Sequence, residues 1–253
     1  MDAIHIEKIL FLDIETVPQT YNYQDLDEAA RTLFEGKNRM KITEEKPGEL
    51  VYKDLGGIQS EFGKIICISV GMVKDSSTGR TIRVKSFAHD DEYTLLSQFK
   101  RLLDDHYKNA ILCGHNAKEF DFPYICRRML INGISLPLAL DIAGKKPWEI
   151  RHLDTMELWK FGDYKAYTGL ALLCHVFGIP TPKDDITGAD VARVYYEDKD
   201  LERIAVYCEK DVIALIQVYL KMHLEPLVSE GNITHVPLTL KDNDRFQRRC
   251  FGP

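Results

Sequence analysis

The pattern of apolar and polar positions along this chain predicts alternating strands and helices. Apolar runs over 8–14 and 64–73 are typical of buried strands, and residues 80–88 alternate as a half-exposed strand does. The polar turn sequence at 74–79, between the last two runs, predicts a hairpin. A hairpin makes its two strands antiparallel neighbours, so we expect a mixed sheet.

Helical periodicity begins after this hairpin. Residues 92–107 place leucines and a phenylalanine on one face, with the preceding aspartates as a cap. A short buried strand over 110–114 then precedes a helix over 122–132. Gly133 ends that helix in the way a left-handed C-cap does.

The remaining elements complete an α/β fold. Residues 150–154 predict a fifth strand, and 201–223 predict the longest helix. We therefore expect one domain over residues 1–228, with a mixed five-stranded sheet and helices on both faces. A C-terminal tail at 229–253 shows little periodicity.

A long polar insertion, residues 22–62, separates the first two strands. A helix over 27–39 is expected within it. Long loops inside compact domains are often lids or binding loops, so a functional role is one interpretation. The alternative is a solvated insertion with no direct role.

Composition restricts the class of protein. Hydrophobic residues at 45% and charged residues at 28% are ordinary for a globular domain. No apolar run approaches the ~20 residues of a membrane helix, and the N-terminus carries acids where a signal peptide is basic. We expect a cytoplasmic protein that does not use a membrane. Its 6 cysteines form no C-x-x-C pair, which favours free thiols over a zinc site.

The formal net charge of −6 bears on possible partners. Proteins that bind duplexes without regard to sequence are normally basic, because phosphate neutralisation supplies their affinity. The acidic balance therefore argues against a dedicated duplex-binding surface. It is compatible with an enzyme that holds a few nucleotides through bound metal ions.

The first segment with candidate chemistry contains two carboxylates. The strand through Leu12 delivers Asp13 and Glu15 at its C-terminal end, and strand alternation puts both side chains on one face. Adjacent carboxylates repel, so one pKa rises or a cation lies between them. Magnesium and manganese favour such oxygen ligands. Taken alone, a D-x-E is common, and a solvated strand terminus is the alternative.

The second segment follows the strand over 110–114. It contains His115 and Asn116, then Phe120 and Asp121 at the start of a helix. In isolation Asp121 is predicted to be an N-cap, since aspartate is a preferred cap residue. His115 is predicted to be a hydrogen-bonded loop histidine rather than a metal ligand.

The third segment lies in the longest helix. Tyr207 and Asp211 are four residues apart and therefore share one face. A polar pair on an otherwise apolar helix is explained in one of two ways. Either a surface tyrosine packs beside a solvated aspartate, or both side chains lie against the carboxylates of the first strand.

Taken together, the three segments resemble the motifs of the DEDD exonuclease superfamily, which run D-x-E, N-x-x-x-F-D and Y-x-x-x-D. The histidine branch would require histidine at Val206, so the chain resembles the tyrosine (DEDDy) branch. Flanking sequence over about residues 8–220 is similar to the proofreading domain of family B DNA polymerases, and to stand-alone predicted exonucleases related to it. The resemblance implies a ribonuclease H-like fold. The matching residues are Asp13, Glu15, Asn116, Phe120, Asp121, Tyr207 and Asp211.

The resemblance also implies a reaction, the 3′→5′ release of nucleoside 5′-monophosphates from single-stranded DNA. Two ions, Mg²⁺ or Mn²⁺, ~3.5–4 Å apart would clamp the attacking and leaving oxygens. Asp13 would bridge both ions, Glu15 and Asp211 would complete the first site, and Asp121 would support the second. Tyr207 would orient the attacking water, because a phenol of pKa ~10 is a poor base.

Contacts to the 3′-terminal nucleotide follow by the same analogy. Ile14 and Thr16 would pack against it or hydrogen-bond it, and Asn116 and Phe120 would flank its sugar and base. Base stacking tolerates any sequence and suits single-stranded 3′ ends.

Two alternatives stay open. An exoribonuclease of the ribonuclease D type is built from the same five residues, and a single 2′-hydroxyl contact decides between the sugars. The flanking similarity to a DNA polymerase domain favours DNA over RNA. A catalytically silent domain that binds nucleic acid or a protein partner is the alternative of another class, and loss of any one carboxylate would favour it.

Overall fold

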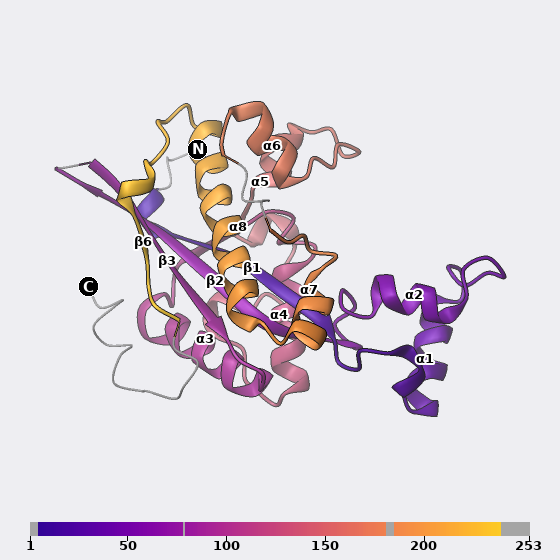
Figure 1. The fold of residues 1–253 in the computed structure, drawn as a ribbon. Coiled ribbons are helices and arrows are strands. Elements are labelled where there is room, and N and C mark those ends of the chain that lie inside the picture. Colours follow the sequence, from indigo (N-terminus) through magenta and orange to yellow (C-terminus); the bar gives the residue numbers. More distant parts are fainter. Residues whose placement is uncertain (1–4, 78, 181–184, 239–253) are drawn as a thin grey trace.

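The computed structural model describes residues 5–77, 79–180 and 185–238 (Figure 1). A six-stranded sheet in the order β5-β4-β1-β2-β3-β6 forms its centre, with helices on both faces. The strands are β1 (Ile9–Pro18), β2 (Gly63–Ser76), β3 (Gly79–Ala88), β4 (Ile111–Gly114), β5 (Leu153–Asp154) and β6 (Ile233–His235). The α-helices are α1 (Glu28–Asn38), α2 (Gly48–Leu55), α3 (Glu92–His106), α4 (Asp121–Ile131), α5 (Thr155–Lys160), α6 (Leu170–Phe177), α7 (Val191–Arg193) and α8 (Leu201–Met222).

The sheet is mixed, as the hairpin predicts. β1 and β2, and β2 and β3, pair antiparallel, whereas β4 is parallel to β1, β5 to β4, and β6 to β3. The predicted count of five strands is wrong. The sixth strand, β6, comes from the segment expected to be a tail, and its 3 residues are too few for a period-2 pattern to be recognised. Residues 239–253 of that tail lie outside the described residues.

Alternate residues of β1 pack into two different core clusters, one on each face of the sheet. Leu10 and Leu12 pack with the cluster that contains residues of α3 and α4, whereas Ile9 and Phe11 pack with α8. Successive strand side chains point to opposite faces, so odd-numbered positions of β1 face α8. Asp13 and Glu15 are odd-numbered positions, so their side chains lie on the face of the sheet that α8 covers.

The predicted long helices are confirmed as α3, α4 and α8, and their local signals act as expected. The Asp91 side chain accepts the Thr94 N–H at 2.9 Å at the start of α3. Gly133, just after α4, has a φ of +69°, which costs a glycine little. Among the described helices, none is both long and apolar enough to cross a membrane. The five described cysteines are free thiols.

The insertion forms a small helical unit beside the sheet (Figure 1). The predicted helix is confirmed as α1, with Asp27 as its cap, and α2 was not predicted. A cluster of Phe34, Val51 and Tyr52 holds the two helices together. The Tyr52 hydroxyl also donates to the Thr20 carbonyl at 2.8 Å, which fixes the unit to the chain leaving β1.

Candidate active site

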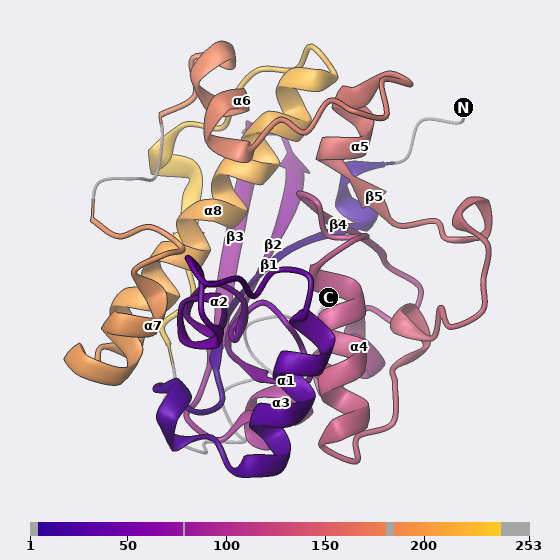
Figure 2. The same ribbon diagram turned by 90° about the vertical axis from the view of Figure 1, so that its right-hand side faces the viewer.

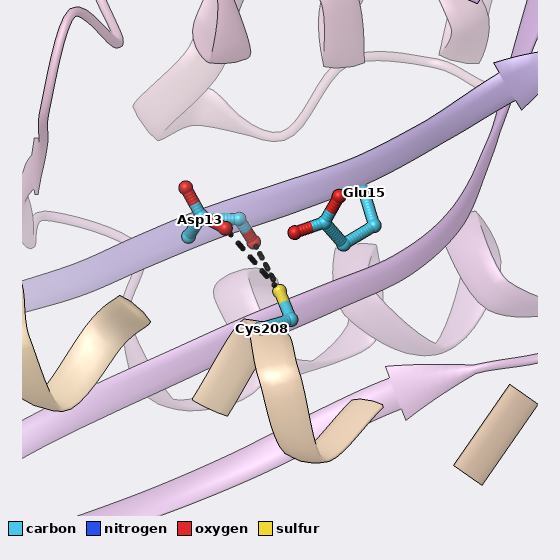
Figure 3. A group of neighbouring side chains, drawn as sticks. All are labelled: Asp13, Glu15 and Cys208. Carbon is cyan, nitrogen blue, oxygen red and sulfur yellow. Dashed lines mark hydrogen bonds between the residues drawn. The ribbon is translucent and has the colours of Figure 1, made fainter. Parts of the chain in front are cut away.

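Asp13 and Glu15 lie within β1 rather than at its end. The prediction of a strand end is wrong because β1 continues to Pro18, with a register shift between Glu15 and Thr16. Such an irregularity re-aims the side chains around it. Both carboxylates point toward Cys208 of α8 (Figure 3). Ligand atoms of Asp13, Glu15 and Cys208 all lie within 4.8 Å of one another.

Asp121 reaches the same place from α4. β4 pairs with β1 only as far as Phe11, so the following part of β1 has no β4 partner. The Ile14 N–H donates to the Asp121 carboxylate instead. The N-cap prediction for Asp121 is wrong, since Phe120 occupies the cap position of α4. A backbone donor needs an acceptor when buried, and Asp121 supplies one to β1.

Tyr207 and Asp211 complete the cluster from α8. Their side chains are hydrogen-bonded to each other, which confirms that they share a face. Burial raises the pKa of the Tyr207 hydroxyl well above its usual value, and the charge of Asp211 raises it further. The phenol therefore keeps its proton at neutral pH.

The carboxylates act strongly on one another. Burial raises the pKa values of Asp13 and Glu15 well above their usual range, and Asp211 raises both further. Asp121 also raises the pKa of Asp13, and its own pKa is raised to about 7 by burial and by the charge of Asp154. Four carboxylates from β1, α4 and α8 therefore form one electrostatic unit. Uncompensated negative charge of this kind is relieved by protons or by cations.

The chemistry of the donors indicates which cations fit. Burial raises the pKa of the Cys208 thiol well above its usual value, and its Sγ lies 3.5 Å from Asp13 Oδ2 as a donor. In this arrangement the thiol is protonated and acts as a hydrogen-bond donor to the Asp13 carboxylate. The remaining ligands are oxygens, which hard divalent cations such as Mg²⁺ and Mn²⁺ prefer.

Two of the four predicted substrate contacts, Thr16 and Phe120, lie beside Tyr124 of α4. Thr16 hydrogen-bonds the Tyr124 hydroxyl, and the Phe120 ring lies 5.3 Å from the Tyr124 ring. The Tyr124 hydroxyl donates to the Gly57 carbonyl at 2.6 Å, so the insertion is fixed to the same residue. Ile14 is only 6% exposed, with its side chain in the core toward α3 and α4.

Asn116 lies in a loop that Asp154 organises. Asn116 has a φ of +63°, which asparagine tolerates better than most residues. The buried Asp154 carboxylate accepts the backbone N–H groups of Asn116 at 2.9 Å, Lys118 at 3.1 Å and Met156 at 2.9 Å. Sequence reasoning missed this role, although an aspartate just before a helical run is a recognisable cap signal.

His115 is a structural residue, as predicted. Its Nδ1 lies 2.9 Å from Thr155 Oγ1 and its Nε2 lies 2.9 Å from the Thr168 carbonyl. Both ring nitrogens are used, and burial lowers its pKa. The ring therefore joins the loop after β4 to both ends of the segment 155–168.

A buried polar group also fixes α8 on the sheet. Glu209 accepts from Ser86 of β3 at 2.9 Å, and its second oxygen lies 2.7 Å from His235 Nδ1 of β6. Glu209 follows Tyr207 by two positions and precedes Asp211 by two, so this contact sets the rotation of α8 about its axis. The sequence carried no signal for it, because a buried, paired glutamate and an exposed one have the same local pattern.

With this geometry established, comparison with known proteins identifies the family. Residues 58–236 match the family described as "Predicted 3'-5' exonuclease related to the exonuclease domain of PolB". The chain belongs to this family. Membership places it among the 3′→5′ exonucleases and confirms the resemblance seen in the motifs. Asp121, Tyr207 and Asp211 lie inside the matched range, whereas Asp13 and Glu15 precede it and are joined to it by the fold.

A solved structure gives the same fold. The family B DNA polymerase from the hyperthermophilic archaeon Pyrobaculum calidifontis matches with a TM-score of 0.53 at 17% sequence identity. The match covers 85% of this chain and 24% of that chain, so the protein spans about a quarter of the polymerase. At this identity the likeness shows a shared ribonuclease H-like fold.

Proposed function

We propose that the protein hydrolyses single-stranded DNA from its 3′ end and releases nucleoside 5′-monophosphates. The observation that supports this proposal is the meeting of four carboxylates and one protonated tyrosine from three separate elements. These residues are Asp13, Glu15, Asp121, Tyr207 and Asp211. Preference for DNA rests on the relation of the family to a polymerase domain.

Two divalent cations, Mg²⁺ or Mn²⁺, fit this donor set. Asp13 would contact both ions, Glu15 and Asp211 the first, and Asp121 the second. When bound, such ions activate water as a nucleophile and stabilise charge on the phosphate. The buried carboxylates hold these positions ready, because their mutual repulsion favours a cation over the empty, fully ionised cluster.

The side chains of the protein orient the reactants. The Tyr207 hydroxyl, which keeps its proton, positions the attacking water through a hydrogen bond and does not remove a proton from it. Asn116 and Phe120 bind the terminal sugar and base, and Thr16 contacts the same nucleotide. The contribution of Ile14 is limited to the small exposed part of its side chain.

A gel assay tests the proposal. Single-stranded DNA and RNA, labelled at the 3′ or 5′ end, are incubated with Mg²⁺, Mn²⁺ or EDTA. Wild type should shorten DNA from the 3′ end only with metal. Asp13→Ala should lower the rate by about 10³-fold or more, because metal stabilisation of the transition state is worth several kcal/mol. Asp105→Asn, which removes an exposed carboxylate from α3, is the matched control.

Each contrary result has a definite meaning. Wild-type rates in Asp13→Ala would refute the assigned centre. Faster shortening of RNA than DNA would favour the exoribonuclease, and intact substrate under every metal condition would favour a silent binding domain.

A further inference from the structure

The connection between α5 and α6 presents aromatic side chains to solvent. Phe161 is 90% exposed, Tyr164 is 86% exposed and Tyr167 is 64% exposed. Large aromatic side chains gathered on a surface generally mark an interaction site, because their burial against a partner removes apolar surface from water, which is favourable. Phe161 moreover has a φ of +43°, a costly backbone conformation for a bulky residue.

Lysines alternate with these aromatics. The Lys160 Nζ lies 4.0 Å from the centroid of the Tyr167 ring, and Lys165 is exposed. The only acid in the segment 160–168 is Asp163, so this segment carries a formal charge of +1 (two lysines minus one aspartate) within a chain of −6. Aromatic faces interleaved with cations are the means by which proteins hold single-stranded nucleic acid without sequence preference.

Both ends of this segment are anchored. Trp159, at its start, turns inward and contacts the Phe177 ring at 5.4 Å, within the cluster that joins α6 to α8. At its other end, the Thr168 carbonyl binds the His115 ring. Figure 2 shows the connection running from α5 to α6. The loop that displays the exposed rings is therefore anchored at both ends.

The anchor at His115 connects the loop to the candidate active site. His115 directly precedes Asn116, the residue proposed to contact the terminal nucleotide, and β4 lies beside the part of β1 that leads to Asp13. The C-terminal end of the aromatic loop therefore lies beside the loop that contains Asn116. The carboxylates themselves repel phosphates, so a surface that uses stacking and two lysines complements them.

We propose that residues 160–168 form a stacking surface for the single-stranded part of the substrate that precedes its 3′-terminal nucleotide. The inference rests on the proposed function, because it takes the nucleic-acid substrate from it. Phe161 and Tyr164 stack on bases, and Lys160 and Lys165 lie near phosphates. Bases paired in a duplex are not available for stacking, so this surface selects single strands.

Two substrates of different length distinguish catalysis at the carboxylate cluster from binding at the stacking surface. The p-nitrophenyl ester of thymidine 5′-monophosphate contains one nucleotide, whereas a 16-nucleotide strand extends beyond the centre. The double variant Phe161→Ala/Tyr164→Ala should lower the ratio of kcat/KM for the strand to kcat/KM for the ester. We expect a loss of about 5- to 100-fold, mostly through KM, from the usual strength of base stacking.

Matched variants test whether an aromatic face is required. Phe161→Trp/Tyr164→Trp should retain the ratio, because tryptophan also stacks. Tyr93→Ala, which removes an exposed aromatic from α3, should leave the ratio at the wild-type value. An unchanged ratio in the double alanine variant, or equal losses in the tryptophan variant, would overturn the stacking surface.

A binding measurement keeps this inference distinct from the proposed function. If wild type hydrolyses neither substrate, the proposed function fails. Fluorescence anisotropy with a labelled 16-nucleotide strand, protected by a 3′-phosphorothioate, then decides the stacking surface alone. Weaker binding by the double alanine variant than by wild type supports it. Equal binding, or no binding by wild type, overturns it.

Discussion

Asp121 gives the most direct physical test of the carboxylate cluster. Its pKa is raised to about 7 in the folded protein from an ordinary value of 3.8. The folded state thus binds this proton more tightly than the unfolded state does. The stabilisation is fully present below pH 4 and is lost as the pH rises through 7. A difference of about 3 pKa units corresponds to about 4 kcal/mol at 1.36 kcal/mol per unit.

The variant Asp121→Asn removes this ionisation and keeps an oxygen that accepts the Ile14 N–H. Without metal, the variant should be more stable than wild type at pH 8, by at most about 4 kcal/mol. The advantage should shrink toward zero as the pH falls to 4, where wild-type Asp121 is itself protonated. Urea unfolding followed by circular dichroism in EDTA, from pH 4 to pH 8, measures this difference.

Metal and a control variant complete the experiment. Adding Mg²⁺ at pH 8 should stabilise wild type more than Asp121→Asn. A ligand that binds only the folded state stabilises it more the more tightly it binds, and the variant lacks one carboxylate ligand. Asp105→Asn is the matched removal of an exposed carboxylate. A difference between Asp121→Asn and wild type that does not change with pH would refute the reasoning, as would a less stable variant at pH 8.

Two further substitutions test individual side chains. Tyr207→Phe should lower kcat by about 10²-fold, because it removes one positioned hydrogen-bond donor. Calorimetry should detect unchanged metal binding by this variant. Loss of metal affinity would contradict the orienting role. Asp154→Ala should lower the free energy of unfolding by about 3 kcal/mol or more, because buried N–H groups of the Asn116 loop lose their acceptor. It should also raise KM for DNA, and a wild-type KM would show that the loop does not position the substrate. Asp105→Asn, which removes an exposed carboxylate of α3, is the control for Asp154→Ala.

Local sequence rules account for much of the fold and for the two residue pairs that supply four of the five central site residues. Alternation in β1 predicts that Asp13 and Glu15 share a face, and the four-residue spacing predicts that Tyr207 and Asp211 do. The cap of α3, the glycine that ends α4, the hairpin and the length of α8 follow from the same short-range physics. These features depend on neighbours within about five positions, so the sequence alone determines them.

The rest depends on groups that meet only after folding. Asp121 has the local pattern of a cap, yet it accepts an N–H from β1, because β4 stops pairing with that strand before Ile14. Glu209 is buried because Ser86 and His235 are there to bind it. Burial and mutual repulsion, which raise the pKa values of the carboxylates, likewise arise only when β1, α4 and α8 pack together. The sequence determined which chemical groups the site contains, and tertiary packing decided their environment, since desolvation and Coulomb interaction depend on distance in space.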